Sequence, residues 1–592
     1  MNQEKRRCQN CKEDFVIEPE DFQFYEKIQV PPPTFCPWCR LIRQTTWRNE
    51  RSLYRRRCAL TGKDIITIFN PDTPVVVYDR DAWWSDAWDP LEFGGDYDFS
   101  KTFFSQFQDI FKVVPLPALF NSFCVNSPYS NHVAYLKNCY LVFASWKCED
   151  TAYATQISEC KNCFDLTTVT HCELGYDLLR GIKLYNVIFS DNCENCTDSA
   201  FLYDCKGCSN CFGCVSLRNK SYYFFNQPLA KEEYKKRIKE FDIGSYKKLE
   251  EMWKKIEEMK LKTIHRFATF SNVKNSTGDF LSEADNCKHC FGLRKEVKDC
   301  KYCVNGGYGM YEIYDNYGAG GNCELSYECI DAGLNSSRFL FGVVLYECHH
   351  VQYSYNCHNC HNVFGCIGLR NKEYCILNKQ YTKEEYEELV PKIIQHMNET
   401  PYIDKLGRIY KYGEFFPSEL SPFAYNETIA QEYSPLTKEE TEKQGYSWKD
   451  PDVRDYKITL KADDLPDHIK DVDDSVLNEI IGCAHQGECR EQCTTAFRII
   501  REEFDFYKRA NLPLPRLCPN CRHYARLKRQ NLIKLWNRKC QCFGLTSENN
   551  IYKNTVTHFH GSDKCSNSFE TSYAPERKEI VYCEACYNAE VV

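Results

Sequence analysis

Cysteines at the two ends of this chain occur as short-spaced pairs, a pattern that suits a bound metal ion. Near the N-terminus, Cys8 and Cys11 precede a second pair, Cys36 and Cys39, in the motif CPWC. Four thiolates from two such turns match the tetrahedral coordination of Zn²⁺ and leave no open position for a substrate. The sequence therefore predicts a structural zinc ion here, rather than a catalytic one.

The same pattern recurs near the C-terminus. Residues 504–540 match residues 22–58 without a gap at an offset of 482, which indicates duplication. The upstream pair differs from the first copy, and Cys483 and His485 lie nearby as alternative ligands. The residues predicted to bind the second zinc ion are Cys489, Cys493, Cys518 and Cys521.

A third zinc site is predicted from Cys565, Cys583 and Cys586, the last two after a short apolar strand. Its fourth ligand stays open among Cys542, His558 and His560. In the N-terminal copy, Asp79 and Ala82 take the places of Cys583 and Cys586. The first copy is therefore expected to have the same small fold without a second metal ion.

Basic residues follow each CPxC pair, with aromatic residues among them. Such segments suit phosphate backbones and stacked bases. The alternatives are protein–protein docking, a solvated helix, or a helix that packs on the acidic remainder of the chain. The predicted nucleic-acid contacts are Arg40, Arg43, Arg48, Arg51, Arg55, Arg56, Arg522, Arg526, Lys528, Arg529 and Lys534.

The central cysteines follow a different rule, a period of 24 residues. Asparagine recurs at this spacing at positions 138, 162, 186 and 210, and cysteine columns such as Cys148, Cys172 and Cys196 accompany it. This period, with short β-branched and aromatic runs, predicts a β-solenoid with coils of about 24 residues. Leu184 and Val187 replace cysteine within the columns, so these cysteines are interpreted as small buried apolar groups.

Two metal-binding alternatives remain open in the centre. The run Cys205, Cys208, Cys211 and Cys214 resembles an iron–sulfur motif. Histidines also crowd the second half of the centre, at positions 349, 350, 358 and 361.

The solenoid is itself duplicated, because residues 208–234 match residues 360–386 at an offset of 152. Each copy is followed by an amphipathic helical segment, at residues 230–262 and 382–397, expected to cap an open solenoid end. The predicted organisation is a zinc ribbon (1–58), a degenerate knuckle and helical connector (59–120), solenoid 1 (121–227), capping helices (228–275), solenoid 2 (276–380), a helix with irregular linker (381–480), a second zinc ribbon (481–545) and a zinc knuckle (546–592). The fold class is thus mainly β with helices: a duplicated β-solenoid flanked by duplicated modules of treble-clef or zinc-ribbon type.

Composition narrows the functional classes. The chain has 592 residues, 38 of them cysteine, and a formal net charge of -8, so no global attraction to nucleic acid exists. The N-terminus lacks an apolar signal segment and no run is long enough to cross a membrane, so a reducing, cytoplasmic location is expected.

Several strings resemble a family of cysteine-rich zinc-ribbon proteins of candidate-phyla bacteria. They are ALTGK, AWWSDAWDPLEFG, FGC(V/I)(S/G)LRNK, GEFFPSELSPFAYNE and LPRLCPNCRH. The resemblance covers the whole chain and implies zinc ribbons flanking a cysteine-rich middle. It implies no activity.

Three functions are compatible with these features. The first is a non-enzymatic protein with two or three structural Zn²⁺ ions whose basic ribbons bind nucleic acid, RNA or a ribonucleoprotein. The second is an assembly scaffold that binds protein partners or self-associates. The third is a solenoid enzyme, although the sequence holds no paired-carboxylate motif, phosphate-binding loop or HExxH motif.

Overall fold

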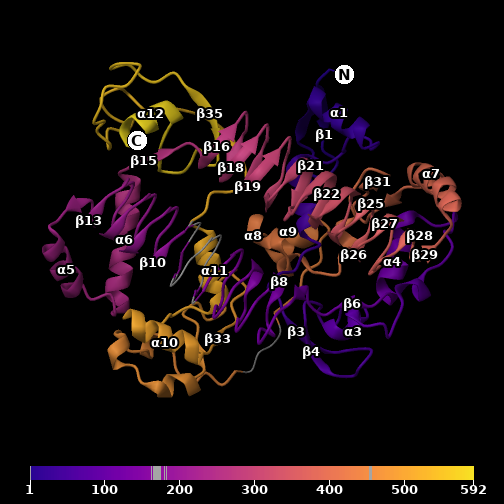
Figure 1. Cartoon of the computed structure of the whole chain (residues 1–592), viewed down its shortest axis with the longest axis horizontal. Helices are drawn as coiled ribbons and strands as arrows, with labels where there is room; N and C mark the ends of the chain where they lie inside the picture. The colour runs from indigo at the N-terminus through magenta and orange to yellow at the C-terminus, as the bar shows by residue number, and fades with distance from the viewer. Residues whose placement is uncertain are drawn as a thin grey trace. The chain divides into compact units, whose positions relative to one another are not determined.

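The computed structural model describes residues 2–591 apart from 162, 165–174, 176, 179–180, 182 and 452–455. The chain consists mainly of strands with some helices (Figure 1). It forms two units, each from segments far apart in the sequence: residues 1–119, 268–449 and 533–535, and residues 120–267, 450–532 and 536–592. The N-terminal cysteine module therefore belongs to the same unit as the second repeat block, and the C-terminal modules belong to the same unit as the first repeat block. The eight consecutive segments predicted from the sequence do not include this pairing of distant segments.

In the second unit, short parallel strands pair with partners twelve residues further along the chain. Asn131 pairs with Phe143, and Ser209 pairs with Ser221. The pairing step is half of the predicted 24-residue coil, so residues 24 apart lie two steps apart. An antiparallel strand, β14 (Gln227–Pro228), ends the block, so the sheet is mixed. The parallel strands are β7 (Asn121–Ser122), β8 (Asn131–Ala134), β9 (Phe143–Trp146), β10 (Tyr185–Ile188), β11 (Thr197–Ala200), β12 (Ser209–Phe212) and β13 (Ser221–Phe224).

Within this block the backbone conformation repeats every third residue. The φ angle is positive at Tyr135, Asn138, Leu141, Ala144 and Lys147. The residue after each of these is buried: Leu136, Cys139, Val142, Ser145 and Cys148. Asparagine enters the left-handed region more readily than most residues, which accounts for its recurrence at positions 138, 186 and 210. Cysteines spaced by three are thus successive interior positions; Asn162 and Cys172 lie outside the described residues.

Small interior side chains also satisfy backbone groups. Sγ of Cys139 lies 3.4 Å from the carbonyl oxygen of Lys137 and 3.5 Å from that of Cys148. Burial raises the pKa of Cys139 to about 11, so the group stays a weakly donating thiol. The candidate metal groups found among the described residues contain none of the central cysteines or histidines.

Buried serine side chains also form hydrogen bonds with backbone groups, and a hydroxyl forms stronger ones than a thiol does. Ser199 provides a test. Its Oγ accepts a hydrogen bond from the Cys211 amide at 3.0 Å and donates to the Thr197 carbonyl at 2.7 Å. Ser199→Ala should lower the free energy of unfolding by roughly 1–3 kcal/mol, because a buried amide loses its acceptor. Urea denaturation measures the change. Ser209→Ala, at an outward position, is the control and should stay within about 0.5 kcal/mol of the unaltered chain; equal losses would contradict the assignment.

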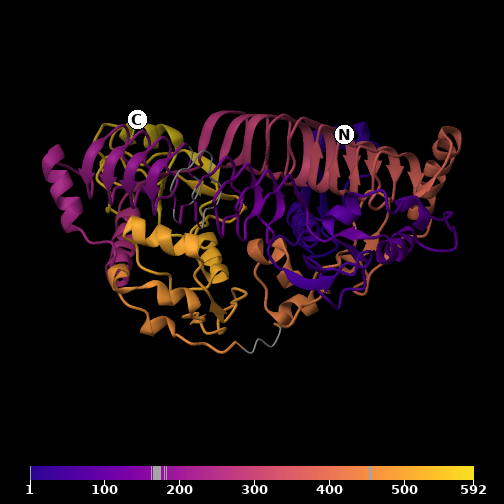
Figure 2. The same ribbon diagram turned by 60° about the horizontal axis from the view of Figure 1, so that its bottom comes forward.

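The first unit contains a longer row of parallel strands, drawn pink to coral in Figure 2. The pairing step varies from eleven to thirteen residues at the start of the row, is thirteen between Met310 and Cys323, and is twelve in its second half, as between His349 and His361. This change explains why residues 286–350 are less regular in sequence. The main strands are β16 (Phe270–Lys274), β18 (Leu281–Asp285), β19 (Cys290–Lys298), β20 (Val304–Gly307), β21 (Met310–Tyr317), β22 (Cys323–Leu334), β23 (Ser336–Leu340), β24 (Val343–Tyr346), β25 (His349–Gln352), β26 (Tyr355–His358), β27 (His361–Phe364) and β28 (Glu373–Ile376).

Helices follow each block as the sequence predicts. They are α5 (Lys231–Glu240) and α6 (Tyr246–Leu261) after the first block and α7 (Lys383–Glu399) after the second. α5 contacts β13 and α7 contacts β28, the last parallel strand of each block. The connector over residues 59–120 contains α3 (Arg80–Trp84) and α4 (Phe103–Val113). Among the described residues, no helix combines the length and apolar character that a membrane crossing requires.

Candidate metal centres

The first cysteine group unites the four residues predicted at the N-terminus. Cys8 and Cys11 lie in the turn between β1 (Glu4–Arg7) and β2 (Asp14–Ile17). Cys36 is the N-cap of α2 (Pro37–Thr45), and Cys39 lies in the first turn of that helix. The four sulfur atoms all lie within 4.8 Å of one another, a geometry that fits a metal ion.

The second group differs from the predicted set in one ligand. It contains Cys483 together with Cys493, Cys518 and Cys521. Cys483 follows β32 (Ile481–Gly482), and Cys518 caps α11 (Pro519–Leu527). Cys489, the predicted ligand, lies instead in a neighbouring group that shares Cys521, with its Sγ 3.6 Å from that of Cys521.

The third group takes as its fourth member a residue that the sequence did not single out. Cys540 joins Cys565, Cys583 and Cys586, and all four are buried. Cys540 follows β34 (Trp536–Lys539), which pairs with β35 (Ser568–Thr571). Cys583 separates β36 (Ile580–Tyr582) from α12 (Glu584–Val591). The predicted alternatives Cys542, His558 and His560 form a separate group with Cys586.

All three groups share one local architecture. The first cysteine follows a β-strand, and its sulfur accepts the backbone N–H of the third cysteine: Cys36 to Cys8 at 3.3 Å, Cys518 to Cys483 at 3.3 Å and Cys583 to Cys540 at 3.2 Å. The third cysteine precedes a helix, whose N-terminal amides favour negative charge. Hydrogen bonds from neighbouring thiols hold the pKa of Cys8, Cys518 and Cys583 well below the usual range, and the same hydrogen bonds raise the pKa of Cys39, Cys521 and Cys586.

A fourth copy of this architecture lacks the other ligands. Cys58 follows β3 (Tyr54–Arg57), and its sulfur accepts the backbone N–H groups of Thr61 at 3.3 Å and Asp79 at 3.1 Å. Thr61, Asp79 and Ala82 stand where the other copies have cysteine. The knuckle therefore keeps its fold with Cys58 as the single thiol at these four positions.

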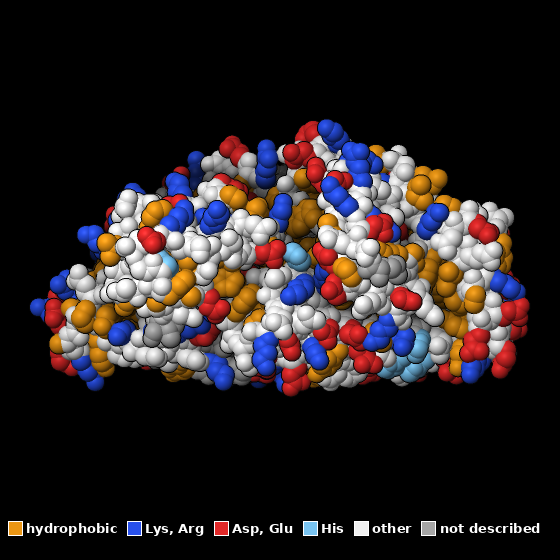
Figure 3. All heavy atoms as spheres, turned by 90° about the horizontal axis from the view of Figure 1, so that it is seen from above, with side chains coloured by type: hydrophobic (Ala, Val, Ile, Leu, Met, Phe, Trp, Pro, Cys, Tyr) orange, Lys and Arg blue, Asp and Glu red, His pale blue; other side chains and the backbone are white. Residues whose placement is uncertain are grey.

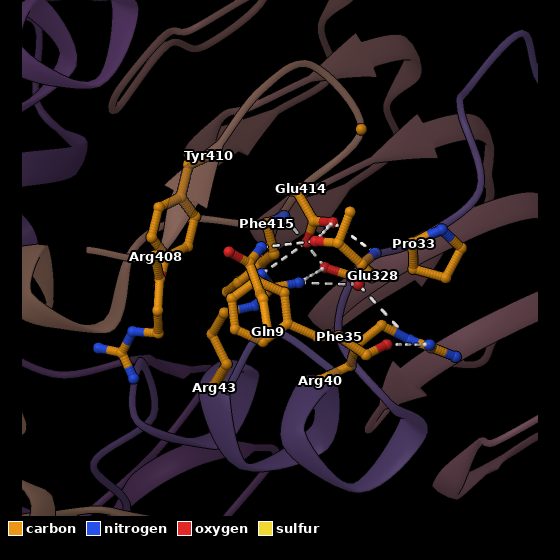
Figure 4. Close-up of polar contacts among 12 residues, drawn as sticks. Gln9, Pro33, Phe35, Arg40, Arg43, Glu328, Arg408, Tyr410, Glu414 and Phe415 are labelled. Carbon is orange, nitrogen blue, oxygen red and sulfur yellow. Dashed lines mark hydrogen bonds and ion pairs between the residues drawn. The ribbon is translucent and has the colours of Figure 1, made fainter. Parts of the chain in front are cut away.

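Basic side chains after the first CPxC pair are directed into the first unit. The Arg40 guanidinium donates to Asp315 at 3.0 and 2.9 Å. That of Arg43 donates to Glu328 at 2.6 Å and to Glu414 at 2.8 Å (Figure 4). Arg40 is 1% exposed and Arg43 is 2% exposed. Because α2 contacts β21 and β22, which carry Asp315 and Glu328, these ion pairs attach the cysteine module to the repeat block.

Arg48 extends this network. It pairs with Glu50 at 2.5 Å and with Asp331 at 3.0 Å, and it lies over the ring of Tyr317. Arg48 is buried, so it too faces the protein interior.

The basic segment of the second cysteine module is partly internal. Arg522 is buried, pairs with Glu503 at 3.0 Å and lies over the ring of Tyr153. Arg526 is buried as well. Arg529 pairs with Asp177, a residue of the repeat block in the same unit.

The other predicted contacts are less enclosed. Arg51 and Arg56 are half-buried, and Arg56 donates to the Val75 carbonyl at 3.0 Å. Arg55, Lys528 and Lys534 are exposed, with Lys528 paired to Glu491. On the face drawn in Figure 3, Lys and Arg side chains are interspersed with Asp and Glu. Within each unit, part of the predicted contact set is therefore buried and the rest is half-buried or exposed.

The buried network predicts a pH dependence. Arg40 and Arg43 face three carboxylates, Asp315, Glu328 and Glu414, and burial raises the pKa of Glu328 to about 7. In the unfolded chain Glu328 loses its proton near pH 4.5, whereas in the native state it keeps the proton up to about pH 7. The stability that comes from this difference is therefore fully present below pH 4.5 and is lost as the pH rises through 7. Glu328→Gln should remove this fall. Urea unfolding of both proteins between pH 5 and 8 tests it, and parallel curves would contradict it.

Comparisons with known proteins supply no relative. No protein-family model matches the chain, and no curated protein matches it. A solved structure of a candidate acetyltransferase from Desulfovibrio desulfuricans G20 is 8% identical, with 53% of this chain and 77% of that chain covered and a TM-score of 0.11. A likeness this weak carries no argument about fold or activity, so function must be inferred from the geometry of the chain itself.

Proposed function

We propose that this chain is a zinc-dependent, non-enzymatic scaffold that binds a protein partner. Zinc is the ion that four cysteines in a closed tetrahedral group favour. The three groups built on strand, turn and helix N-terminus support structural zinc sites, each of which stabilises a module too small to have a large core of its own.

The repeat blocks supply the rigid part of the scaffold. Their parallel strands pair at steps of twelve or thirteen residues, and interior positions recur every third residue in the first block. We propose that each block is a β-solenoid with coils of this length. Ion pairs of Arg43 with Glu328 and of Arg529 with Asp177 then anchor a zinc module to each block.

An exposed aromatic column carries the proposal of a protein partner. Phe123, Tyr135 and Trp146 are 68%, 45% and 43% exposed, and Val125 beside them is 63% exposed. The rings of Phe123 and Tyr135 are stacked with centroids 4.9 Å apart, and those of Tyr135 and Trp146 meet edge to face at 4.9 Å. Aromatic residues of this kind are enriched at the centres of protein interfaces.

Nucleic acid fits this column less well. Because the rings contact one another, their facing surfaces are not available to an intercalated base. Lys137 and Lys161, in the neighbouring column of the same block, both pair with Glu149, at 2.7 and 3.6 Å. Together with the burial of Arg40, Arg43, Arg522 and Arg526, this favours protein over RNA.

Affinity capture with the full chain tests the proposal. Bait carrying Phe123→Ser, Tyr135→Ser and Trp146→Ser should lose proteins that the unaltered bait retains from an extract of the source cells. The matched control replaces Tyr308 and Tyr311, exposed aromatic residues of the first unit, by Ser. Zinc content and the urea unfolding midpoint verify that each bait is folded. Equal retention by both variants, or retention that RNase abolishes, would contradict a protein-binding role.

A further inference from the structure

A second set of possible metal ligands lies beside the third cysteine group and shares one member with it, Cys586. Cys542, His558 and His560 lie in the segment between Cys540 and Cys565, and their ligand atoms lie with Sγ of Cys586 within 4.8 Å of one another. Sγ of Cys542 is 3.7 Å from Nδ1 of His558, and Nε2 of His560 is 3.3 Å from Sγ of Cys586. Two sulfur and two nitrogen donors therefore face a common point.

Hydrogen bonds orient both imidazoles for metal binding. Nε2 of His558 lies 2.9 Å from a carboxylate oxygen of Glu590, and both side chains are fully buried. Nδ1 of His560 lies 2.7 Å from the carbonyl oxygen of Asp563. Because each acceptor requires a proton on the nitrogen that it contacts, the opposite nitrogen keeps its lone pair, directed toward the cysteines. Ligating histidines in proteins are commonly held in this way.

Glu590 also fixes the segment that carries the histidines. Its carboxylate accepts the backbone N–H of Thr555 at 2.9 Å and that of Val556 at 3.3 Å, and the Tyr552 hydroxyl donates to it at 3.1 Å. Since Glu590 belongs to α12, the helix that begins after Cys583, one helix positions both donor sets.

Cys586 is common to both donor sets. We propose that a second zinc ion is bound by Cys542, His558, His560 and Cys586, next to the ion held by Cys540, Cys565, Cys583 and Cys586, so that the Cys586 thiolate bridges the two. A four-sulfur set and a set of two sulfurs with two nitrogens both match the tetrahedral preference of Zn²⁺.

The three modules differ in the segment between their first two cysteines, and this difference accounts for the second donor set. In the first module the segment is residues 9–10, and no additional ligand falls there. In the third it is residues 541–564, which carry Cys542 and both histidines. In the second it is residues 484–492, which carry His485, Cys489 and Glu491, and these group with the equivalent shared cysteine, Cys521. A longer segment between the first two cysteines thus places further metal-binding side chains beside the last cysteine of the group, which is Cys521 in the second module and Cys586 in the third.

Metal stoichiometry of the full chain tests the bridge. The double variant His558→Ala, His560→Ala should bind one zinc ion per chain fewer than the unaltered protein, measured by mass spectrometry of the metal after gel filtration. His361→Ala, at an exposed position of the first unit, is the control and should leave the count unchanged. An unchanged count in the double variant would overturn the proposal.

If the double variant unfolds and loses more than one ion, a second measurement that needs no substitution tests whether Cys586 bridges two metal ions. The full chain loaded with cadmium-113 should give resonances from its four-sulfur sites and one from a mixed sulfur–nitrogen site, and the mixed-site resonance should show scalar coupling to one four-sulfur resonance through the shared sulfur of Cys586. Absence of the mixed-ligand resonance, or of the coupling, would overturn the bridge.

Discussion

Cys36→Ser is expected to remove one metal ion from the chain and to unfold the N-terminal module. Cys36 contributes a ligand and also begins α2, the helix that carries Arg40 and Arg43. Structural zinc contributes roughly 10–16 kcal/mol to the folding of such small modules, far more than their own cores supply. Metal analysis should show the lost ion, and hydrogen exchange should show lost protection over residues 4–45.

Cys58→Ser is the matched control for this experiment. Cys58 occupies the same place after a strand as Cys8 does, is buried to the same degree and accepts two backbone N–H groups. Its neighbours Thr61, Asp79 and Ala82 do not provide three further thiolates, so its substitution should leave the metal count unchanged. Loss of an ion from the Cys58 variant, or retention of all ions in the Cys36 variant, would contradict the assignment of the first site.

Arg43→Ala is expected to lower the free energy of unfolding of the first unit by about 3–5 kcal/mol. The substitution leaves Glu328 and Glu414 buried without the cation that contacts both. Loss of one partner from a buried ion pair has a cost of this size because the remaining charge stays desolvated. Urea denaturation followed by tryptophan fluorescence measures the change, with Trp47 among the buried tryptophans of this unit.

Arg57→Ala provides the comparison for a surface pair. Its side chain is 81% exposed and lies 3.5 Å from Asp64, so the effect should stay within about 0.5 kcal/mol. Adding Glu328→Gln and Glu414→Gln to Arg43→Met should recover part of the loss, because the unpaired charges are then gone. If Arg43→Ala were as stable as Arg57→Ala, the ion pairs would not be what holds α2 to the strands.

The sequence predicts the metal ligands well where spacing is a local constraint. Each CPxC pair forms one helix N-terminus, so Cys36, Cys39, Cys518 and Cys521 could be assigned from the motif alone. The upstream ligand depends on the length of a turn, which varies between the modules. Proximity in sequence favoured Cys489, whereas the turn places Cys483 after its strand in the position of Cys8.

The basic residues illustrate a limit of local composition. A run of arginine beside a zinc motif is typical of a surface that binds phosphates, and nothing near it in the sequence suggests otherwise. Asp315 and Glu414, the partners of Arg40 and Arg43, lie 275 and 371 residues further along the chain. The hypothesis of a helix that packs on the acidic remainder of the chain matches this arrangement, but which carboxylates face it is a property of the tertiary structure.

The repeat period shows a similar limit. Neighbouring strands pair at a step of twelve residues, but positions twelve apart often hold different residue types. The same residue type, asparagine or cysteine, therefore recurs most regularly after two steps, at a spacing of 24 residues. The conformational period of three residues is visible in the sequence only as cysteines spaced by three, which also suggests an iron–sulfur motif. In the structure each of these cysteines follows a residue in the left-handed region and faces the interior, as the three-residue repeat requires.

The N-terminal module belongs to the same unit as a block that lies far along the chain, so the order of synthesis determines when the first unit can be completed. The N-terminal module leaves the ribosome first, yet the strands and carboxylates that it contacts lie within residues 268–449. At roughly 5–20 residues per second, residue 449 follows residue 119 by roughly 15–65 s. During that interval the nascent module can take up its metal ion, while Arg40 and Arg43 remain hydrated cations. The first unit is therefore completed only after most of the polypeptide has been made.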